Sequence, residues 1–212
     1  MVSFGGPAGS AKSGTVRPSW TSESPMPDVA KLETVRELIS AEEITRRRRE
    51  LAGEIERDYG GEDLLLVCIL RGSMVFFVDL AREIDLPLRF DYVDVSSYGD
   101  GTSPGALELR ADLREPIEGR HVLLVEDIVD TGRTARFLVD RLSARGPASL
   151  HVAALLDKPS RRVVDVEIAY CGFTIPDRFV VGYGLDWAQL YRNLPYIGVL
   201  DALDGAGAAR IE

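Results

Sequence analysis

The sequence predicts an α/β fold with a mostly parallel central sheet flanked by helices. One observation is the alternation of short apolar runs with amphipathic ones after Gly60 and Gly61, which is typical of strand–helix–strand units. A second is the run at residues 64–70, LLLVCIL, which is apolar throughout like a strand buried on both faces. A third is the length of 212 residues, which suits one such domain with a sizeable core.

The first expected element is a helix that begins after Ser40. Ser40 and Glu43 have the spacing of a capping box, and apolar residues at 44, 51 and 55 recur on one helical face. We interpret the arginine run at 46–49 as a solvated face, because four consecutive residues splay around a helix and nearby glutamates offer ion-pair partners. The later expected elements are strands at 64–70, 88–95, 121–126 and 150–156 and helices at 73–84 and 133–144.

Three segments depart from this alternation. Residues 96–116 are glycine-rich at first and then alternate like an extended hairpin arm, which predicts a mobile lid loop. Residues 166–200 carry the short β-like runs VEIAY, FVVGY and YIGVL, which suggest a small hood subdomain. Residues 1–27 are expected to be a disordered tail and residues 205–212 a flexible end, with one domain over 28–204.

Composition argues against several classes of function. The formal net charge of −9 disfavours a nucleic-acid binder or an anionic-membrane binder. The longest apolar runs are far shorter than the roughly 20 residues of a membrane span. Cys68 and Cys171 lie in apolar segments and are expected to be reduced, and His121 and His151 are interpreted as structural. We therefore expect a cytoplasmic protein without a zinc site.

The stretch VEDIVDTGRT, residues 125–134, carries the most specific chemical signal. It places acidic side chains at the end of a predicted strand and a Thr-Gly-Arg-Thr turn at the start of the next helix. A helix N-terminus attracts phosphate through its amides and dipole, whereas carboxylates accept hydrogen bonds from sugar hydroxyls or help to hold Mg²⁺. Acids followed by an anion cradle fit one ligand, a sugar that carries a phosphate. The spacing differs from that of a P-loop.

VEDIVDTGRT resembles the phosphoribosyl-pyrophosphate signature of the type I phosphoribosyltransferases. From about residue 40 to residue 200 the chain is similar to the hypoxanthine-guanine phosphoribosyltransferases of purine salvage. The shared motifs, in the family's order, are LRGS at 70–73, SSYG at 96–99, LLDKPSRR at 155–162, IPDRFVVGYGLD at 175–186 and YRNLPYIG at 191–198. The resemblance implies the type I fold with a hood and a lid. It also implies transfer of the 5-phosphoribosyl group from phosphoribosyl pyrophosphate to N9 of hypoxanthine or guanine.

The resemblance assigns roles to individual residues. Asp130 takes or steadies the proton on N7 of the purine, and Lys158 selects a 6-oxo group over the amino group of adenine, because an ammonium is only a donor. Arg71 meets the leaving pyrophosphate next to a non-proline cis peptide. The ribose and its phosphate bind Glu126, Asp127, Asp130, Thr131, Gly132, Arg133 and Thr134; pyrophosphate binds Leu70, Arg71, Gly72 and Arg192; and the purine binds Lys158, Phe179, Val180 and Asp186.

Mg²⁺ is the implied cofactor: Glu126 and Asp127 would help to hold it through its waters, and Asp186 would help to bind a second Mg²⁺ at the pyrophosphate. Ser97 and Tyr98 match the lid that closes over the reacting centre and excludes water. Arg162 matches a family arginine near the sugar phosphate. Surface ion pairs remain an alternative interpretation of Arg162 and of Arg192.

Two departures from the family pattern are visible. Arg71 stands where some members have lysine, which bears on pyrophosphate affinity, and Trp187 stands where tyrosine is expected. An alternative hypothesis is a regulator that senses phosphoribosyl pyrophosphate and has no transferase activity; Asp130 and the acidic charge disfavour it. The resemblance also implies a homo-oligomer, dimer or tetramer. The sequence does not determine the preference between hypoxanthine and guanine or any use of xanthine.

Overall fold

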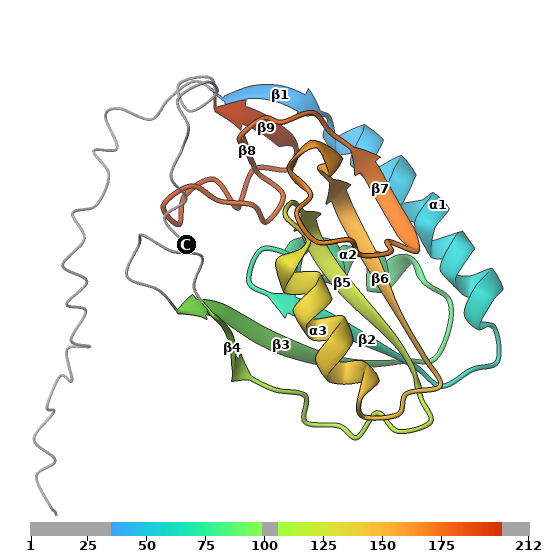
Figure 1. Ribbon diagram of the computed structural model, residues 1–212. Helices are drawn as coiled ribbons and strands as arrows, with labels where there is room; N and C mark the ends of the chain where they lie inside the picture. Colours follow the sequence, from blue (N-terminus) through green and yellow to red (C-terminus); the bar gives the residue numbers. More distant parts are fainter. Residues whose placement is uncertain (1–34, 99–105, 201–212) are drawn as a thin grey trace, which may run out of the picture. The chain divides into compact units, whose positions relative to one another are not determined.

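The computed structural model describes residues 35–98 and 106–200 (Figure 1). The expected N-terminal tail at 1–27, the flexible end at 205–212 and the glycine-rich part of the lid at 99–105 lie outside these described residues. Both limits of the expected domain, 28 and 204, lie outside them as well.

A six-stranded sheet forms the centre of the fold, in the order β4-β3-β2-β5-β6-β7. Every neighbouring pair is parallel except β3 with β4, which is antiparallel. The strands are β2 (Leu64–Leu70), β3 (Leu88–Tyr98), β4 (Ala106–Ala111), β5 (His121–Val129), β6 (Ser149–Asp157) and β7 (Tyr170–Thr174). The predicted α/β class and mostly parallel sheet are confirmed.

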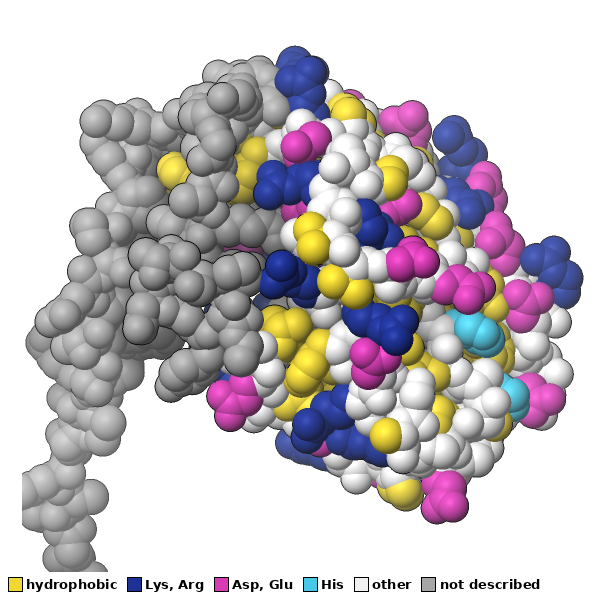
Figure 2. Space-filling model, in the orientation of Figure 1, with side chains coloured by type: hydrophobic (Ala, Val, Ile, Leu, Met, Phe, Trp, Pro, Cys, Tyr) yellow, Lys and Arg dark blue, Asp and Glu magenta, His cyan; other side chains and the backbone are white. Residues whose placement is uncertain are grey.

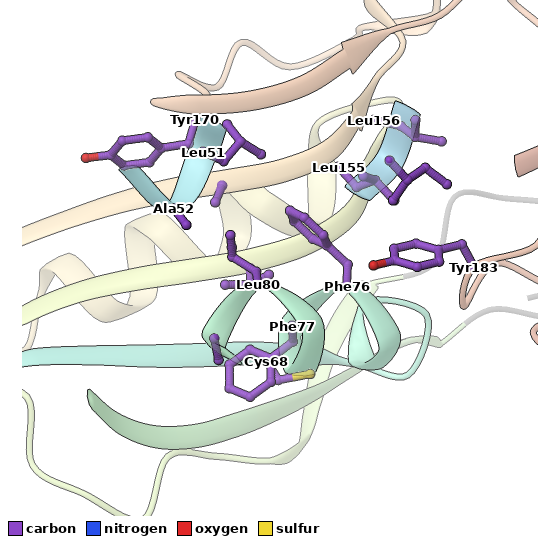
Figure 3. Packing of buried hydrophobic residues seen from close by; sticks show 14 of the residues in the cluster. Leu51, Ala52, Cys68, Phe76, Phe77, Leu80, Leu155, Leu156, Tyr170 and Tyr183 are labelled. Carbon is purple, nitrogen blue, oxygen red and sulfur yellow. The ribbon is translucent and has the colours of Figure 1, made fainter. Parts of the chain in front are cut away.

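Helices cover both faces of this sheet (Figure 1). Helices α1 (Ala41–Tyr59) and α2 (Met74–Glu83) pack on one face, and α3 (Arg133–Ser143) packs on the other. Alternate positions of the strands divide between two apolar clusters. In the larger cluster Phe76 and Leu80 of α2 lie between the sheet and α1 (Figure 3), so the strand ends are held rigidly on both sides.

A second, three-stranded sheet forms the hood, in the order β1-β9-β8. It consists of β1 (Val35–Ile39), β8 (Val180–Val181) and β9 (Ile197–Leu200), all antiparallel. The sequence predicted a hood from the C-terminal part alone, and this was incomplete because β1 supplies an edge strand. Of the VEIAY run only Tyr170 is in a strand, since β7 begins there.

The arginine run on α1 is less solvated than predicted. The capping box between Ser40 and Glu43 is present, and Arg46 lies near its i+4 partner Glu50. Arg48, however, has a side chain only 13% exposed, with ion pairs to Asp79 at 2.8 Å and Glu83 at 2.7 Å on α2. One arginine of the run therefore lies between the helices. On the face drawn in Figure 2, basic and acidic side chains are interspersed.

The remaining expectations concern the cysteines, the histidines and the membrane. Cys68 and Cys171 are free thiols. His121 and His151 hydrogen-bond to Ser149 at 2.8 Å and Tyr59 at 2.7 Å, which fits structural roles. Among the described helices, none has the length and apolar character that a bilayer crossing demands.

Candidate active site

The predicted site residues follow three neighbouring strands at one edge of the sheet. Leu70 ends β2 and residues 71–72 follow it, residues 130–132 follow β5, and Lys158 follows β6. Since β5 pairs in parallel with both β2 and β6, the carboxyl ends of all three strands meet there. Parallel α/β sheets bind their ligands at this edge. The backbone N–H of Lys158 donates to the Val129 carbonyl at 3.0 Å, which joins two of the segments.

The acidic pair lies within the last part of β5, which runs to Val129 and so extends three residues beyond the expected strand at 121–126. Glu126 Oε2 is buried and has no hydrogen-bond partner among the described residues. Burial, and then the neighbouring Asp127 carboxylate, raise the pKa of Glu126 well above its ordinary value of 4.5. Asp127 Oδ1 accepts from the Ile128 N–H at 2.7 Å, which fixes that side chain. The pair is thus held in an arrangement that a cation would relieve.

The loop at 70–72 approaches the acidic pair closely. A Cβ atom on Gly72 would overlap Asp127 Oδ2, so only glycine leaves room for this carboxylate. The Leu70–Arg71 peptide bond is cis, as the resemblance implies. Buried Ser73 closes the loop by donating from Oγ to the Ile69 carbonyl at 2.5 Å, while Arg71 is exposed. The proposed pyrophosphate and ribose segments are therefore in contact.

The turn at 130–134 has the form of an anion cradle. Gly132 is left-handed, with φ of 83°, and a Cβ atom there would overlap the Val164 carbonyl oxygen. Helix α3 begins at Arg133 with no acidic residue in its first turn, while Thr131 and Thr134 are half-buried. Amides at a helix start, two hydroxyls and no acid in the first turn suit a phosphate.

Two arginines support this turn from the loop after β6. Arg162 donates from Nε to the Asp130 carbonyl at 3.1 Å and from Nη2 to the Val129 carbonyl at 3.2 Å, and it pairs with Asp157. Arg161 Nε lies 3.3 Å from Oδ1 of Asp130, a residue only 5% exposed. Arg162 thus braces the backbone, which a surface ion pair does not do. Sequence reasoning missed Arg161, although it lies in the quoted LLDKPSRR motif.

The expected purine-binding residues lie beside Lys158. Lys158 is 5% exposed, its Nζ donates to the Arg178 carbonyl at 2.7 Å, and Asp177 Oδ1 is 3.8 Å away. Phe179, which follows Arg178 in the chain, is half-buried, and Val180, the first residue of β8, is buried. A buried ammonium is thereby anchored to the backbone of the segment that carries the expected stacking ring.

Asp186 and Arg192 form a pair in the hood. Arg192 Nη2 lies 2.6 Å from Asp186 Oδ1, and Arg192 Nη1 donates to the Gly184 carbonyl at 2.7 Å. The other Asp186 oxygen accepts from the Gln189 N–H at 2.8 Å. Each Asp186 oxygen thus has one partner in this arrangement, and a carboxylate oxygen has a second lone pair that can bind a metal.

The lid residues are described through their backbone. Ser97 and Tyr98 end β3 and pair with Leu107 and Ala106 of β4, so the predicted hairpin arm exists. Their side chains, like residues 99–105, lie outside the described part of the chain. Closure of the lid stays a prediction.

Mg²⁺, the cofactor that the resemblance implies, fits the acidic pair. The test is the buried Glu126 Oε2 atom without a partner, next to a second carboxylate. Hard oxygen donors are what Mg²⁺ takes, and it commonly binds one or two carboxylates together with water and phosphate oxygens. Glu126 and Asp127 are therefore the residues that would hold it.

Comparisons with known proteins agree with this geometry. Residues 35–187 match the family described as "Phosphoribosyl transferase domain". A hypoxanthine-guanine phosphoribosyltransferase of Streptococcus pneumoniae is 49% identical over 164 residues, which cover 77% of this chain and 91% of the relative. One of Mycobacterium avium is 50% identical over 171 residues, covering 77% and 84%. A solved Staphylococcus aureus hypoxanthine phosphoribosyltransferase has a TM-score of 0.75 at 46% identity, covering 78% of this chain and 90% of that chain.

Proposed function

This chain belongs to the phosphoribosyl transferase family, and from that premise we propose that it is a hypoxanthine-guanine phosphoribosyltransferase of purine salvage. It takes phosphoribosyl pyrophosphate and hypoxanthine or guanine and forms IMP or GMP plus pyrophosphate. The observation that carries the proposal is the meeting, at one sheet edge, of an acidic pair, an anion cradle and a buried lysine. Relatives with this name cover most of the chain.

The arrangement supports direct displacement at C1′ of the ribose. N9 of the purine attacks C1′ as the bond to pyrophosphate breaks, and the purine proton passes toward Asp130. The 5′-phosphate is held by the turn at 130–134, and the diol by Glu126 and Asp127. Arg71 and Arg192 stabilise the departing charge, and no covalent enzyme intermediate is needed. Mg²⁺, when bound, neutralises charge on the pyrophosphate.

The proposal is tested by measuring kcat/KM for hypoxanthine, guanine, xanthine and adenine with phosphoribosyl pyrophosphate and Mg²⁺. We expect transfer to hypoxanthine or guanine and little to adenine. A chain that binds phosphoribosyl pyrophosphate but forms no monophosphate from any base is instead the regulator that shares this fold. The same assay measures the relative use of hypoxanthine, guanine and xanthine.

Gly72→Ala is expected to disturb the acidic pair more than the fold. The new Cβ overlaps Asp127 Oδ2, so the Asp127 side chain has to move. We expect kcat/KM for phosphoribosyl pyrophosphate to fall by about tenfold to a hundredfold as a result. The melting temperature changes little. The control is Gly53→Ala on α1, where a Cβ meets nothing within 4 Å. Equal kinetics in the two variants contradict a role for this close approach.

Glu126→Gln is expected to stabilise the metal-free protein and to weaken catalysis. The pKa of Glu126 is higher in the folded protein than its ordinary value of 4.5 in the unfolded chain. As pH rises above 4.5, the unfolded chain therefore loses this proton first, and the free energy of unfolding of the wild type falls until pH reaches the folded pKa. Glutamine removes this loss. At pH 7.5 without Mg²⁺ we expect a melting temperature higher by about 2–4 °C, which roughly 1 kcal/mol produces at this size.

The matched control is Glu167→Gln, at an exposed position before β7. Calorimetry with and without Mg²⁺ provides the second measurement. We expect Mg²⁺ to raise the melting temperature of the wild type and of the control by similar amounts, and that of Glu126→Gln by a smaller amount. A Glu126→Gln protein that is less stable than wild type at pH 7.5 contradicts the assignment.

A homo-oligomer and a cytoplasmic location complete the proposal. Met74, Val75 and Val78 on α2 are 48%, 36% and 46% exposed, and Phe90 on β3 is 58% exposed. Phe90 touches Phe77 of α2 with ring centroids 5.3 Å apart, so it packs against the helix that carries the other three exposed apolar side chains. A second copy of the chain suits this surface. Light scattering is expected to give a dimer or tetramer mass. Free thiols at Cys68 and Cys171 accord with a reducing compartment.

A further inference from the structure

An open pocket lies between helices α1 and α2 and the chain that joins β8 to β9. Its volume is about 430 Å³. One wall comes from α1 and α2 and includes Arg48, Val75 and Asp79, and the opposite wall comes from residues 192–195. In the loop at residues 182–195, here called the hood loop, Tyr183 and Leu185 pack in the large apolar cluster, whereas residues 192–195 border this pocket. The apolar packing is supplemented by a directional side-chain contact, made of hydrogen bonds, to α1 and α2.

Tyr183 makes that contact. Its hydroxyl donates to Asp79 Oδ2 at 2.8 Å on α2 and accepts from Arg48 Nη1 at 3.2 Å on α1. Arg48 also donates to the same Asp79 oxygen at 2.8 Å, which closes a triangle of hydrogen bonds. In Figure 3 the Tyr183 ring extends from the hood loop toward α2. Tyr183 is only 6% exposed.

The backbone of the hood loop carries this anchor to the site. The Tyr183 N–H donates to the Leu194 carbonyl at 2.9 Å, and the Gly184 N–H donates to the Arg192 carbonyl at 3.0 Å. Arg192 Nη1 in turn donates a hydrogen bond to the Gly184 carbonyl at 2.7 Å. Arg192 is thus joined through main-chain bonds to the residues next to Tyr183, and a shift of Tyr183 moves it.

Gly184 is also the point at which the hood loop meets the loop at 70–72. Its φ is 103°, and a Cβ atom there would overlap the Gly72 carbonyl oxygen. The contact is backbone against backbone, with the Val75 side chain beside it. Tyr183, one residue earlier, is the nearest side chain of the hood loop that bonds to the helices.

We propose that Tyr183 is a positioning residue for pyrophosphate: its hydroxyl, held by Asp79 and Arg48, fixes Arg192 and Gly184 against the loop at 70–72. The proposal rests on the proposed function, because it deepens the role of Arg192 in that reaction. It concerns the pyrophosphate half of the site and leaves the purine half to Lys158.

The chemistry of the triangle suits a permanent anchor. Burial, and then the bond to Asp79, raise the pKa of Tyr183 above its ordinary value. The phenol therefore keeps its proton and stays a donor at physiological pH. Because Arg48 faces both Asp79 and Glu83, the positive charge is matched within the cluster.

The decisive variant is Tyr183→Phe, which keeps the buried ring and removes only the hydroxyl. We expect KM for phosphoribosyl pyrophosphate and the inhibition constant of pyrophosphate to rise about tenfold, an effect near 1.4 kcal/mol. The KM for hypoxanthine and the affinity for IMP stay within about twofold, because neither ligand needs Arg192. A general loss of folding does not produce this split.

Tyr170→Phe is the matched control. Tyr170 is 5% exposed, and its hydroxyl donates to Asp58 on α1 at 2.8 Å. It therefore loses the same kind of bond, in a part of the chain that the proposed site does not use. Both variants are expected to lose a similar amount of thermal stability, and only Tyr183→Phe is expected to change the pyrophosphate constants. Equal constants in the two variants overturn the proposal.

Two further measurements keep the test decisive. Asp79→Ala removes the acceptor from a half-exposed position, so it reports on the anchor even if Tyr183→Phe folds poorly, and the same rise in KM is expected. In an Arg192→Gln background, Tyr183→Phe is expected to add less than twofold, because both changes act through one guanidinium. Additive effects overturn the route through Arg192. A wild type that is inactive on every purine refutes the proposed function, whereas an active wild type with an unchanged Tyr183→Phe refutes this inference alone.

Discussion

Replacing Asp130 by asparagine is expected to lower kcat by about two to four orders of magnitude, the usual contribution of a positioned acid or base. Asp130 is 5% exposed on the turn between β5 and α3, and Arg161 Nε lies 3.3 Å from its Oδ1, so the carboxylate is held by burial and by this ion pair. Asparagine keeps the shape but cannot take up a proton from N7 of the purine. The backbone of the turn is held separately by Arg162 at the Asp130 and Val129 carbonyls. IMP binding is therefore expected to stay within a few-fold of wild type.

Single-turnover kinetics and calorimetric titration with IMP measure the two quantities independently. Asp140→Asn is a suitable control, because Asp140 lies on the exposed side of α3 and pairs with Arg136 at 2.9 Å. Its kcat is expected to match wild type. If Asp130→Asn also turns over at the wild-type rate, Asp130 has no part in proton transfer. If it loses IMP binding in proportion to kcat, the residue acts through the cradle.

The local parts of the site could be predicted from sequence because each lies within a few residues. Acid pair, turn and helix start all fall within VEDIVDTGRT, and chain geometry places a strand end next to a helix N-terminus. The capping box at Ser40 and Glu43 is equally local and is present. Parallel pairing of β2, β5 and β6 then joins three such segments at one edge.

The parts that could not be predicted depend on pairs far apart in the chain. Arg48 and Tyr183 are separated by 135 positions, and nothing in RRRR distinguishes the one arginine that lies between helices. Strand β1, VRELI, is short and has two charged residues among its five, and it exists because β9 offers an edge to pair with. Neither the arginine run nor the VRELI segment carries a local sequence signal for its distant partner.

The same division applies to glycine. Gly132 sits in the recognisable Thr-Gly-Arg-Thr turn, and its φ of 83° is one that glycine adopts without strain. Gly72 and Gly184 are required by other parts of the chain, namely the Asp127 carboxylate and the Gly72 carbonyl oxygen. Sequence alone shows that these are glycines, and the structure shows which atoms exclude a side chain. The close approaches gather where the proposed pyrophosphate and ribose segments meet.

Lys158→Gln is expected to remove most of the discrimination between 6-oxopurines and adenine. The lysine ammonium donates and cannot accept, and it is 5% exposed with its Nζ bound to the Arg178 carbonyl at 2.7 Å. In the wild type, adenine would therefore place its 6-amino group, a donor, against the buried lysine, which is also a donor. We expect kcat/KM for adenine to be lower than that for hypoxanthine by about 10⁴-fold or more. Glutamine offers both a donor and an acceptor, so kcat/KM for hypoxanthine falls about a hundredfold while that for adenine does not fall.

A competition assay with hypoxanthine and adenine in one mixture measures the ratio directly and is independent of the amount of active enzyme. Lys158→Met separates two causes. Methionine has no donor in its side chain. If the ammonium selects the base, the ratio of hypoxanthine to adenine use therefore falls in Lys158→Met as well as in Lys158→Gln. A ratio that stays high in both variants means that Phe179, Val180 and the neighbouring backbone carbonyls select the base by shape. In that case the buried lysine serves chiefly to tie β6 to the Arg178 carbonyl, and the assignment of base class moves to the backbone of the hood.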